Sequence, residues 1–285
     1  MILHDFLPNP MVREFIQFYR IVHFEFDNSA NLPSKAYPPK PEQCLHFFLR
    51  DPSAIETISA KKSYQPPIVL SGQRTSLIKR YIGTSFLDTQ IVFQPTAVFR
   101  LTGIPAYEFT DQLIDGTAVF SKNIEFTFEQ LQLAKNYAEI LVLLKQFSQN
   151  LVCQARQDCV LLDAVSRQMM QPSKNSSIDW LAKESCLCTK QFERKFIQRA
   201  GVNPKTYARI IRFNRAYNLR NHFPDKDWLS IAIEGGYCDY QHLAKDYKDF
   251  TGFTPPEFHL LESNSPENVL GLTKSLYKTR FKTIS

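Results

Sequence analysis

Apolar positions in the C-terminal part of the chain follow one helical plan twice. The first copy has an apolar helix face at residues 178–182, then a turn, then a helix rich in polar residues that opens at Thr189. The second copy has an apolar face at residues 228–232 and a polar helix that opens at Asp239, 50 residues further on. The helical period continues between the copies over residues 205–220. This pattern predicts two helix-turn-helix units joined by a stiff helix.

The N-terminal half shows a different pattern. Short runs of aromatic and β-branched residues are separated by proline clusters, which is typical of strands in a small barrel or sandwich. The runs cover residues 21–26, 45–49, 68–70 and 87–93. After residue 95 the period becomes helical, with a short helix expected over 107–113 and a long helix over 125–154. We therefore expect an α+β chain with a β-rich barrel and helices in its N-terminal half and an all-α C-terminal half.

These patterns divide the chain into three parts. Residues 1–150 are expected to form a β-rich sensor or dimerisation domain that ends in the long helix, and residues 151–262 to form the double helix-turn-helix domain. Residues 172–177 are expected to be a loop inside that second domain. Residues 263–285 are polar and poorly patterned, so a basic tail without stable structure is expected there. The cations of this tail are Lys274, Lys278, Arg280 and Lys282.

Charge is unevenly distributed along the chain. The 285 residues carry a formal net charge of +6. Residues 1–171 hold sixteen Lys and Arg against sixteen Asp and Glu, whereas residues 172–285 hold eighteen against twelve. The whole positive excess therefore lies on the half that contains the repeated helical plan. A module that displaces counterions from DNA phosphates has this distribution, although an imbalance of this size also arises by chance.

The cysteines give no sign of a metal or of export. The six cysteines, at positions 44, 153, 159, 186, 188 and 238, form no CxxC pair and have no histidines at zinc-finger spacing. We therefore expect no structural zinc site. The sequence has no basic-then-apolar leader at Met1 and no apolar run near the length of a membrane span, so we expect no export and no membrane anchor. The thiols are then expected to be reduced in the cytoplasm.

The N-terminal half offers little for catalysis. Its histidines are His4, His23 and His46, which are scattered singly, whereas cupin enzymes hold a metal with closely spaced histidines and a carboxylate. Cys44 and His46 share a strand face, but such a pair is usually accidental. No glycine-rich phosphate loop, GxSxG or HExxH occurs. We expect no catalytic residue, no bound metal and no cofactor.

A set of residues across the repeated helical plan resembles the AraC/XylS family of transcription regulators. The resemblance covers about residues 158–261. It is carried by Phe192, Phe196, Gly201, Pro204, Tyr207, Arg212, Ala216 and Leu219, and then by Ile231, Ala232, Gly236, Tyr237, Leu243, Tyr247, Gly252, Thr254, Pro255 and Phe258. The DNA-binding domain of this family is two helix-turn-helix units joined by a linker helix. The resemblance therefore implies a sequence-specific transcription regulator whose partner is double-stranded DNA.

The order of the modules is also similar to that of many AraC-type regulators, whose N-terminal half is cupin-like and senses a signal. This resemblance implies a small-molecule effector or a partner in the N-terminal half. A rival hypothesis is a constitutive or architectural DNA binder whose N-terminal half only dimerises, and a weaker one is a catalytic cupin tethered to DNA. An enclosed apolar cavity favours sensing, a solid core favours dimerisation, and converging metal ligands favour catalysis.

Two positions depart from the family pattern. Cys186 stands in the first turn, where the family usually has glycine, and Cys188 stands where a helix-capping serine is usual. A thiol is a poor hydrogen-bond acceptor. We therefore expect Thr189, one place later, to cap the free amides of the first recognition helix.

The outward face of the first recognition helix supplies the first candidates for DNA contact. Phe192 and Phe196 are four residues apart and are predicted to be core. The outward candidates are Thr189, Lys190, Gln191, Glu193 and Arg194. Arg194 can bond guanine through two hydrogen bonds, whereas Glu193 must find a cytosine amine or repel phosphate, so Arg194 ranks above Glu193. The alternative for Glu193 is an ion pair with a nearby cation.

The second recognition helix repeats this arrangement, with Leu243 and Tyr247 at the core spacing. Its outward candidates are Tyr240, Gln241, His242, Ala244 and Lys245. Gln241 can bond adenine through two hydrogen bonds, and Ala244 can pack on a thymine methyl group. Tyr240 and His242 suit phosphate equally well. Asp239 is expected to cap this helix, and Arg212 of the linker helix is expected to be structural.

The predicted long helix has an apolar seam with two open interpretations. The seam consists of Leu133, Tyr137, Ile140, Leu144, Phe147 and Leu151. Such heptad-like spacing occurs where a helix packs on its own domain and also where it forms a homodimer. Pattern alone leaves the two interpretations equally open.

Overall fold

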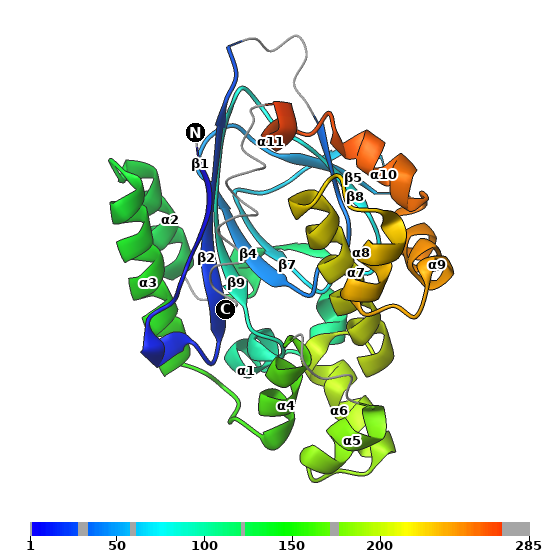
Figure 1. The fold of residues 1–285 in the computed structure, drawn as a ribbon. Coiled ribbons are helices and arrows are strands. Elements are labelled where there is room, and N and C mark those ends of the chain that lie inside the picture. Colours follow the sequence, from blue (N-terminus) through cyan, green and yellow to red (C-terminus); the bar gives the residue numbers. More distant parts are fainter. Residues whose placement is uncertain (1, 28–33, 58–60, 121–122, 172–176, 270–285) are drawn as a thin grey trace.

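The N-terminal half of the chain is a two-sheet sandwich (Figure 1). The structure is a computed structural model that describes residues 2–27, 34–57, 61–120, 123–171 and 177–269. The first sheet has the order β1-β2-β9-β4-β7-β10, and the second has the order β3-β8-β5-β6. The first sheet consists of β1 (Ile2–Phe6), β2 (Ile16–Glu25), β4 (Gln43–Phe48), β7 (Ile68–Ser71), β9 (Ser85–Phe93) and β10 (Leu113–Asp115). The second consists of β3 (Ser34–Tyr37), β5 (Ala54–Thr57), β6 (Ser63–Tyr64) and β8 (Ile78–Tyr81).

The strands predicted for residues 21–26, 45–49, 68–70 and 87–93 are confirmed, because β2, β4, β7 and β9 cover nearly all of these residues. The closed barrel is wrong. Among the described residues no backbone ladder joins the two sheets. They meet through side chains, as where the guanidinium of Arg80 lies 5.1 Å from the ring centroid of Phe48. The fold is an open sandwich of two sheets.

The central strands β2, β4 and β9 present different chemistry on their two faces, because successive side chains of a strand point in opposite directions. Leu45 lies opposite Ile91 in the apolar core, and His46 lies opposite Gln90 on the other face. Arg20 belongs to this polar face, where it donates to Asp5 at 2.8 Å. A buried guanidinium needs such a partner, since an isolated buried charge is strongly destabilising.

Two helices, α2 (Asn123–Leu133) and α3 (Tyr137–Cys153), cover the apolar face of the first sheet (Figure 1). The single helix predicted for residues 125–154 is therefore wrong. Asn136 has an extended backbone, and its side-chain oxygen accepts a hydrogen bond from the backbone N–H of Glu139 at 3.0 Å. Such a cap starts a new helix at Tyr137.

Only part of the apolar seam of α2 and α3 is buried against other described residues. Ile140, Leu144 and Phe147 are buried in the core of the N-terminal half. Leu133, by contrast, is 73% exposed, and Val142 is also exposed. Packing on the sheet therefore explains the middle of the seam and leaves apolar side chains of the same two helices in solvent.

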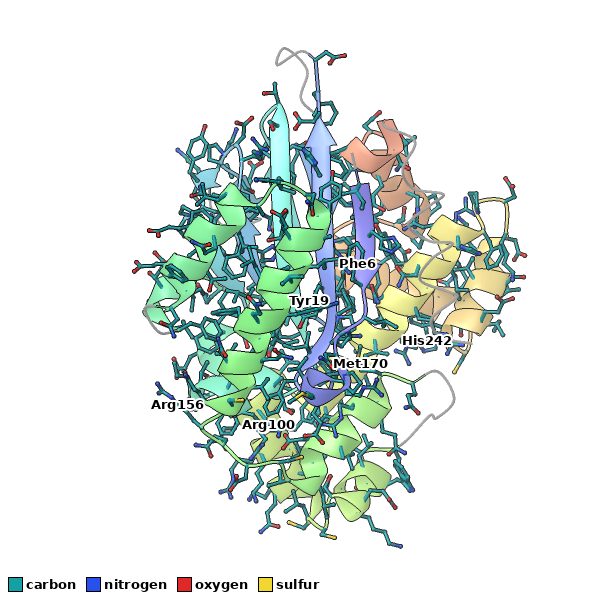
Figure 2. All side chains as sticks on the ribbon, turned by 90° about the vertical axis from the view of Figure 1, so that its left-hand side faces the viewer. Phe6, Tyr19, Arg100, Arg156, Met170 and His242 are labelled. Carbon is teal, nitrogen blue, oxygen red and sulfur yellow. The ribbon has the colours of Figure 1, made fainter. Side chains whose placement is uncertain are left out.

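The two halves meet at the lower end of the first sheet. Figure 2 shows Arg100 and Arg156 close together there, and the backbone N–H of Arg156 donates to the carbonyl of Arg100 at 2.9 Å.

The short helix predicted for residues 107–113 is wrong in extent, because Leu113 already pairs with β7 as a strand residue. The short helices of the N-terminal half are η1 (Pro10–Val12), α1 (Ala97–Thr102), η3 (Ala106–Phe109) and η4 (Gly116–Ala118).

The described part of the C-terminal half is entirely helical (Figure 1). Its helices are α4 (Leu161–Met169), α5 (Ile178–Glu184), α6 (Thr189–Ala200), α7 (Pro204–His222), α8 (Trp228–Gly235), α9 (Tyr240–Thr251), α10 (Pro255–Glu262) and α11 (Pro266–Val269). The stiff helix predicted over residues 205–220 is confirmed, because α7 covers all of these residues. The prediction of an unstructured tail is wrong for α11, and residues 270–285 with the four tail cations lie outside the described residues. So does the loop predicted at residues 172–177, except for Ser177, which caps α5.

Candidate nucleic-acid interface

The first helix-turn-helix unit, α5 and α6, is built on a buried aromatic pair. Phe192 and Phe196 are fully buried, and their ring centroids lie 5.7 Å apart. They belong to one apolar cluster with Leu181 and Ala182 of α5. The predicted core spacing is therefore confirmed, and the opposite face of α6 is turned to solvent.

The outward face of α6 carries cations without internal partners. Lys190, Gln191 and Arg194 are exposed, and Thr189 and Glu193 are half-buried. Among the described residues, no carboxylate lies within 4.0 Å of the charged nitrogens of Lys190 or Arg194. Glu193 likewise has no cation at that distance in the described part of the chain, so its alternative of an internal ion pair is not observed there. This face is suited to external anions and base edges.

The start of α6 differs from the prediction. Cys188 occupies the N-cap position with an extended backbone, and its backbone N–H donates to Oε1 of Gln191 at 3.5 Å. Thr189 is the first helical residue, and its Oγ1 donates to Oδ1 of Asp179 at 2.8 Å. The prediction that Thr189 caps the helix is therefore wrong. Cys186, at the family's glycine position, has a left-handed backbone with φ of 54°.

The second unit, α8 and α9, repeats the plan with a better cap. Leu243 and Tyr247 are fully buried, as predicted. Asp239 caps α9, because its Oδ1 accepts a hydrogen bond from the backbone N–H of His242 at 2.8 Å. This bond lowers the pKa of the Asp239 carboxyl group. The capping prediction is confirmed, and α9 itself begins one residue later, at Tyr240.

The outward residues of α9 differ in how freely they can reach a partner. Gln241, His242 and Lys245 are exposed, and Tyr240 and Ala244 are half-buried. The Nδ1 atom of His242 lies 2.9 Å from Oδ1 of Asp239, and Figure 2 shows His242 near the outer edge of the C-terminal helices. Tyr240 packs against the apolar cluster of the second unit. Gln241 and Lys245 are thus the exposed outward residues whose side chains form no hydrogen bond or ion pair with other described residues.

The helix α7 is tied to the second unit through a buried carboxylate, Asp246. Arg209 and Arg212 pair with Asp246 of α9 at 2.7 Å and 3.3 Å. Arg212 also lies over the ring of Tyr237 at 4.4 Å, which confirms its predicted structural role. Burial raises the pKa of Tyr237, whose hydroxyl is hydrogen-bonded to Asp246 at 3.0 Å. Sequence analysis missed Asp246; the signal was a carboxylate placed directly beside the core residue Tyr247.

The residues considered for metal binding are held apart in separate contacts. His46 Nδ1 lies 3.0 Å from Asp88 Oδ2, and His4 packs edge-on against Phe6. His23 contacts the Tyr137 hydroxyl group at 2.7 Å. Within the described residues, no group of three or more His, Cys, Asp or Glu side chains is placed to hold a metal ion.

No described helix is both long enough and apolar enough to cross a membrane.

Comparison with known proteins identifies the C-terminal module. Residues 181–259 match the family described as "Helix-turn-helix domain". An uncharacterized HTH-type transcriptional regulator of Haemophilus influenzae is 28% identical over 141 residues, which are 48% of this chain and 47% of that protein. The match thus spans about half the length of that relative.

Solved structures are similar at a lower level. ToxT of Vibrio cholerae strain SCE256 with a bound unsaturated fatty acid has a TM-score of 0.47 and 11% identity, over 86% of this chain and 94% of that one. ToxT of Vibrio cholerae O395 has a TM-score of 0.45 and 10% identity, over 87% and 98% of the two chains. The AraC-like activator CuxR has a TM-score of 0.20 and 13% identity, over 95% and 91%. At these TM-scores and identities, what the similar proteins bind does not indicate a ligand for this chain.

Proposed function

We propose that this chain, whose residues 181–259 form an AraC-type helix-turn-helix domain, is a transcription regulator that binds double-stranded DNA at specific sequences. The observation that carries the proposal is the pair of polar helix faces held out from buried cores, with Lys190 and Arg194 exposed on α6 and Gln241 and Lys245 exposed on α9. Both units are tied to the 19-residue helix α7. A rigid link between two such helices suits successive major grooves, about 34 Å apart.

The side chains on these faces divide into base readers and phosphate binders. Arg194 is the best candidate to read guanine, and Gln241 is the best candidate to read adenine, because each can form two parallel hydrogen bonds to one base. Lys190 and Lys245 are single positive charges that fit phosphate. The remaining candidates, Thr189, Gln191, Glu193, Tyr240, His242 and Ala244, lie around these four on the same two helices and are proposed as auxiliary contacts.

Charge elsewhere in the C-terminal half supports this division. The arginines of α7 that pair with Asp246 are used to hold the fold together. Lys190 and Arg194 have no such use among the described residues. Because DNA phosphates attract cations, exposed cations without an internal partner among the described residues support a nucleic-acid partner. Because its proposed partner is genomic DNA, the chain is also proposed to act in the cytoplasm.

The N-terminal half is proposed to bind an effector or a partner and to join two copies of the chain. Exposed apolar side chains on α2 and α3 support dimerisation, since Phe126, Leu133 and Val142 all face solvent. The rival function is a constitutive or architectural DNA binder whose N-terminal half only dimerises. The two differ in one observable, because only the first changes its DNA affinity when a small molecule or partner is added. Neither contains a catalytic step.

The test is genome-wide mapping of bound sites combined with titration of the purified chain on the recovered sequence. The expected result is a small set of sites that share one motif, bound about 10³-fold or more tightly than random DNA. A double variant, Arg194→Ala with Gln241→Ala, is expected to lose this preference. Lys61→Ala with Lys62→Ala, which removes two exposed cations beside β6, is the matched control and is expected to keep it. Binding without a shared motif contradicts sequence-specific regulation and supports the architectural alternative.

A further inference from the structure

Residues 34–43, which we call the strap, run from one sheet of the N-terminal half to the other. The strap consists of the edge strand β3, a proline-rich connection and the first residue of β4. Pro38, Pro39 and Pro41 in this connection are all buried. Because proline fixes φ and burial fixes the side chains, the strap is stiff over its whole length.

The strap contacts the first helix-turn-helix unit at the C-terminal end of α6. The side-chain Nε2 of Gln43 donates to the carbonyl of Ala200 at 3.4 Å. The hydroxyl of Tyr207, on the first turn of α7, donates to the carbonyl of Pro41 at 3.5 Å. One acceptor is the backbone carbonyl of the last residue of α6, and the other is a backbone carbonyl of the strap, so the two bonds tie the end of α6 and the start of α7 to the strap.

A second contact beside the strap leaves the end of α6 little freedom. The hydroxyl of Thr110 donates to the carbonyl of Gly201, the residue after α6, at 2.7 Å. Gly201 has a φ of 91°, and a Cβ at this position would lie 2.8 Å from Oγ1 of Thr110 and 3.0 Å from the carbonyl oxygen of Ala106. The recognition helix is therefore seated closely on the N-terminal half.

The strap contacts the second unit at α10. Ala36 of β3 is part of the buried apolar cluster that also contains Phe213, Tyr217, Phe250 and Phe258. Glu262, at the end of α10, is 5% exposed and accepts a hydrogen bond from the Tyr217 hydroxyl at 2.7 Å. Burial raises the pKa of Glu262, whereas the positive charges of Lys35 and Lys40 in the strap act in the opposite direction. Apolar and charged contacts thus hold α10 on the strap.

The strap is itself tied to the sandwich. Glu42 pairs with the buried Arg20 of β2 at 3.2 Å. The side-chain Nε2 of Gln73 donates to the carbonyl of Lys40 at 2.8 Å. The two helix-turn-helix units are therefore connected twice, once through α7 and once through a common support in the N-terminal half.

We propose that the strap sets the spacing between the two half-sites that this chain accepts on DNA. The inference rests on the proposed function and adds a determinant of specificity to it. One extra base pair moves the second half-site by about 3.4 Å and rotates it by about 35°. Two units joined only by α7 can each turn about the ends of this helix to follow such a change, whereas units fixed to one common support cannot. The chain therefore discriminates spacer length as well as base sequence.

The test compares spacer profiles of the full-length chain and two strap variants. Duplexes are selected from a random pool by each protein, and affinities are then measured on the selected operator with one base pair added or removed. For the natural sequence, each change of spacer is expected to weaken binding about tenfold or more. Gln43→Ala removes the bond to α6, and Lys35→Ala removes a positive charge of the strap that acts on Glu262 of α10. Each is expected to reduce the penalty to about threefold while the half-site sequences stay the same.

Gln65→Ala is the matched control, because Gln65 donates to the carbonyl of Ser63 at 3.3 Å away from the joint. It is expected to keep the full spacer penalty. Binding to a single half-site and the thermal unfolding midpoint show that each variant is folded, and the two strap variants act at different contacts, so either one alone decides the question. A folded strap variant with the natural penalty overturns the inference. A folded natural chain with no sequence preference overturns the proposed function itself.

Discussion

Arg194 differs from neighbouring arginines because it forms no ion pair or hydrogen bond with any other residue that the structure describes. Arg199 pairs with Asp163 at 2.8 Å, and Arg209 pairs with Asp246 at 2.7 Å. Arg194 is exposed one turn earlier on α6 than Arg199. A long charged side chain without an internal partner costs conformational entropy only when an external partner orders it. Arg194 is thus exposed and free to meet an external partner, which is why we propose it as a DNA contact.

Arg194→Ala is therefore expected to weaken specific binding by about 1–3 kcal/mol and to relax preference at one base pair. The thermal unfolding midpoint is expected to stay unchanged. Titration against every single-base variant of the operator measures the effect. Gln198→Ala, one turn further along α6 and also exposed, is the control and is expected to alter no position. An unchanged preference profile in Arg194→Ala assigns this residue to phosphate alone.

Cys186 is a residue whose backbone conformation predicts how a substitution changes the stability of the chain. Its φ of 54° lies in the left-handed region, which costs a residue with a Cβ about 1 kcal/mol more than glycine. Cys186→Gly is accordingly expected to stabilise the chain by roughly 0.5–1 kcal/mol, measured by chemical denaturation. Cys238→Gly, in the turn of the second unit, is the control and is expected to destabilise, since Cys238 is not among the described residues with positive φ. Destabilisation by both changes refutes the assignment of strain to Cys186.

At the scale of elements, the sequence predicted the recognition helices better than the helices of the N-terminal half. Phe192 and Phe196 mark α6 because a buried pair four residues apart has one interpretation in a short amphipathic helix. The same periodicity runs without interruption from α2 into α3, so it could not show the break before Tyr137. The break depends on Asn136 adopting an extended backbone, and asparagine is also common on exposed helix faces.

The recognition helices α6 and α9 are expected to read DNA unequally. On α9, Tyr240 is half-buried against its own core and His242 is bonded to Asp239, which leaves Gln241 as the main base reader. On α6, Arg194 and Lys190 are both unpaired among the described residues. One half of the operator is therefore expected to be tightly defined and the other degenerate.

Scrambling each half-site in turn measures this asymmetry. Scrambling the half-site of α6 is expected to cost about 3 kcal/mol or more, and scrambling that of α9 clearly less. The Gln241→Ala chain is the companion variant, in which scrambling the second half-site is expected to cost nothing further. An equal loss at both half-sites, suppressed for the second one in Gln241→Ala, makes the two helices equal readers.

For the whole molecule, the joint between the two halves was beyond prediction from sequence. Periodicity identifies which side chains are buried but does not identify their partners. Ala36 is an unremarkable residue of a short strand, yet it packs among aromatic residues of the second unit. Glu262 follows two exposed leucines at the end of α10 and is nevertheless buried, with the charges of Lys35 and Lys40 in the strap acting on it. Such contacts arise from topology, since the residues involved lie more than 170 positions apart.

An isolated fragment of residues 152–262 tests how far the two halves depend on each other. Both helix-turn-helix units, α7 and nearly all of their apolar clusters lie within it, the exceptions being Ala36 and Leu77 of the N-terminal half. The fragment is therefore expected to fold and to keep the base preferences of each half-site. Without the strap, it is expected to unfold at a lower temperature than the same region of the full chain and to tolerate altered spacers. Circular dichroism and titration on operators of different spacer length provide the measurements. An unfolded fragment places the domain boundary elsewhere, and a folded fragment with altered base preference shows that the N-terminal half shapes base reading as well as spacing.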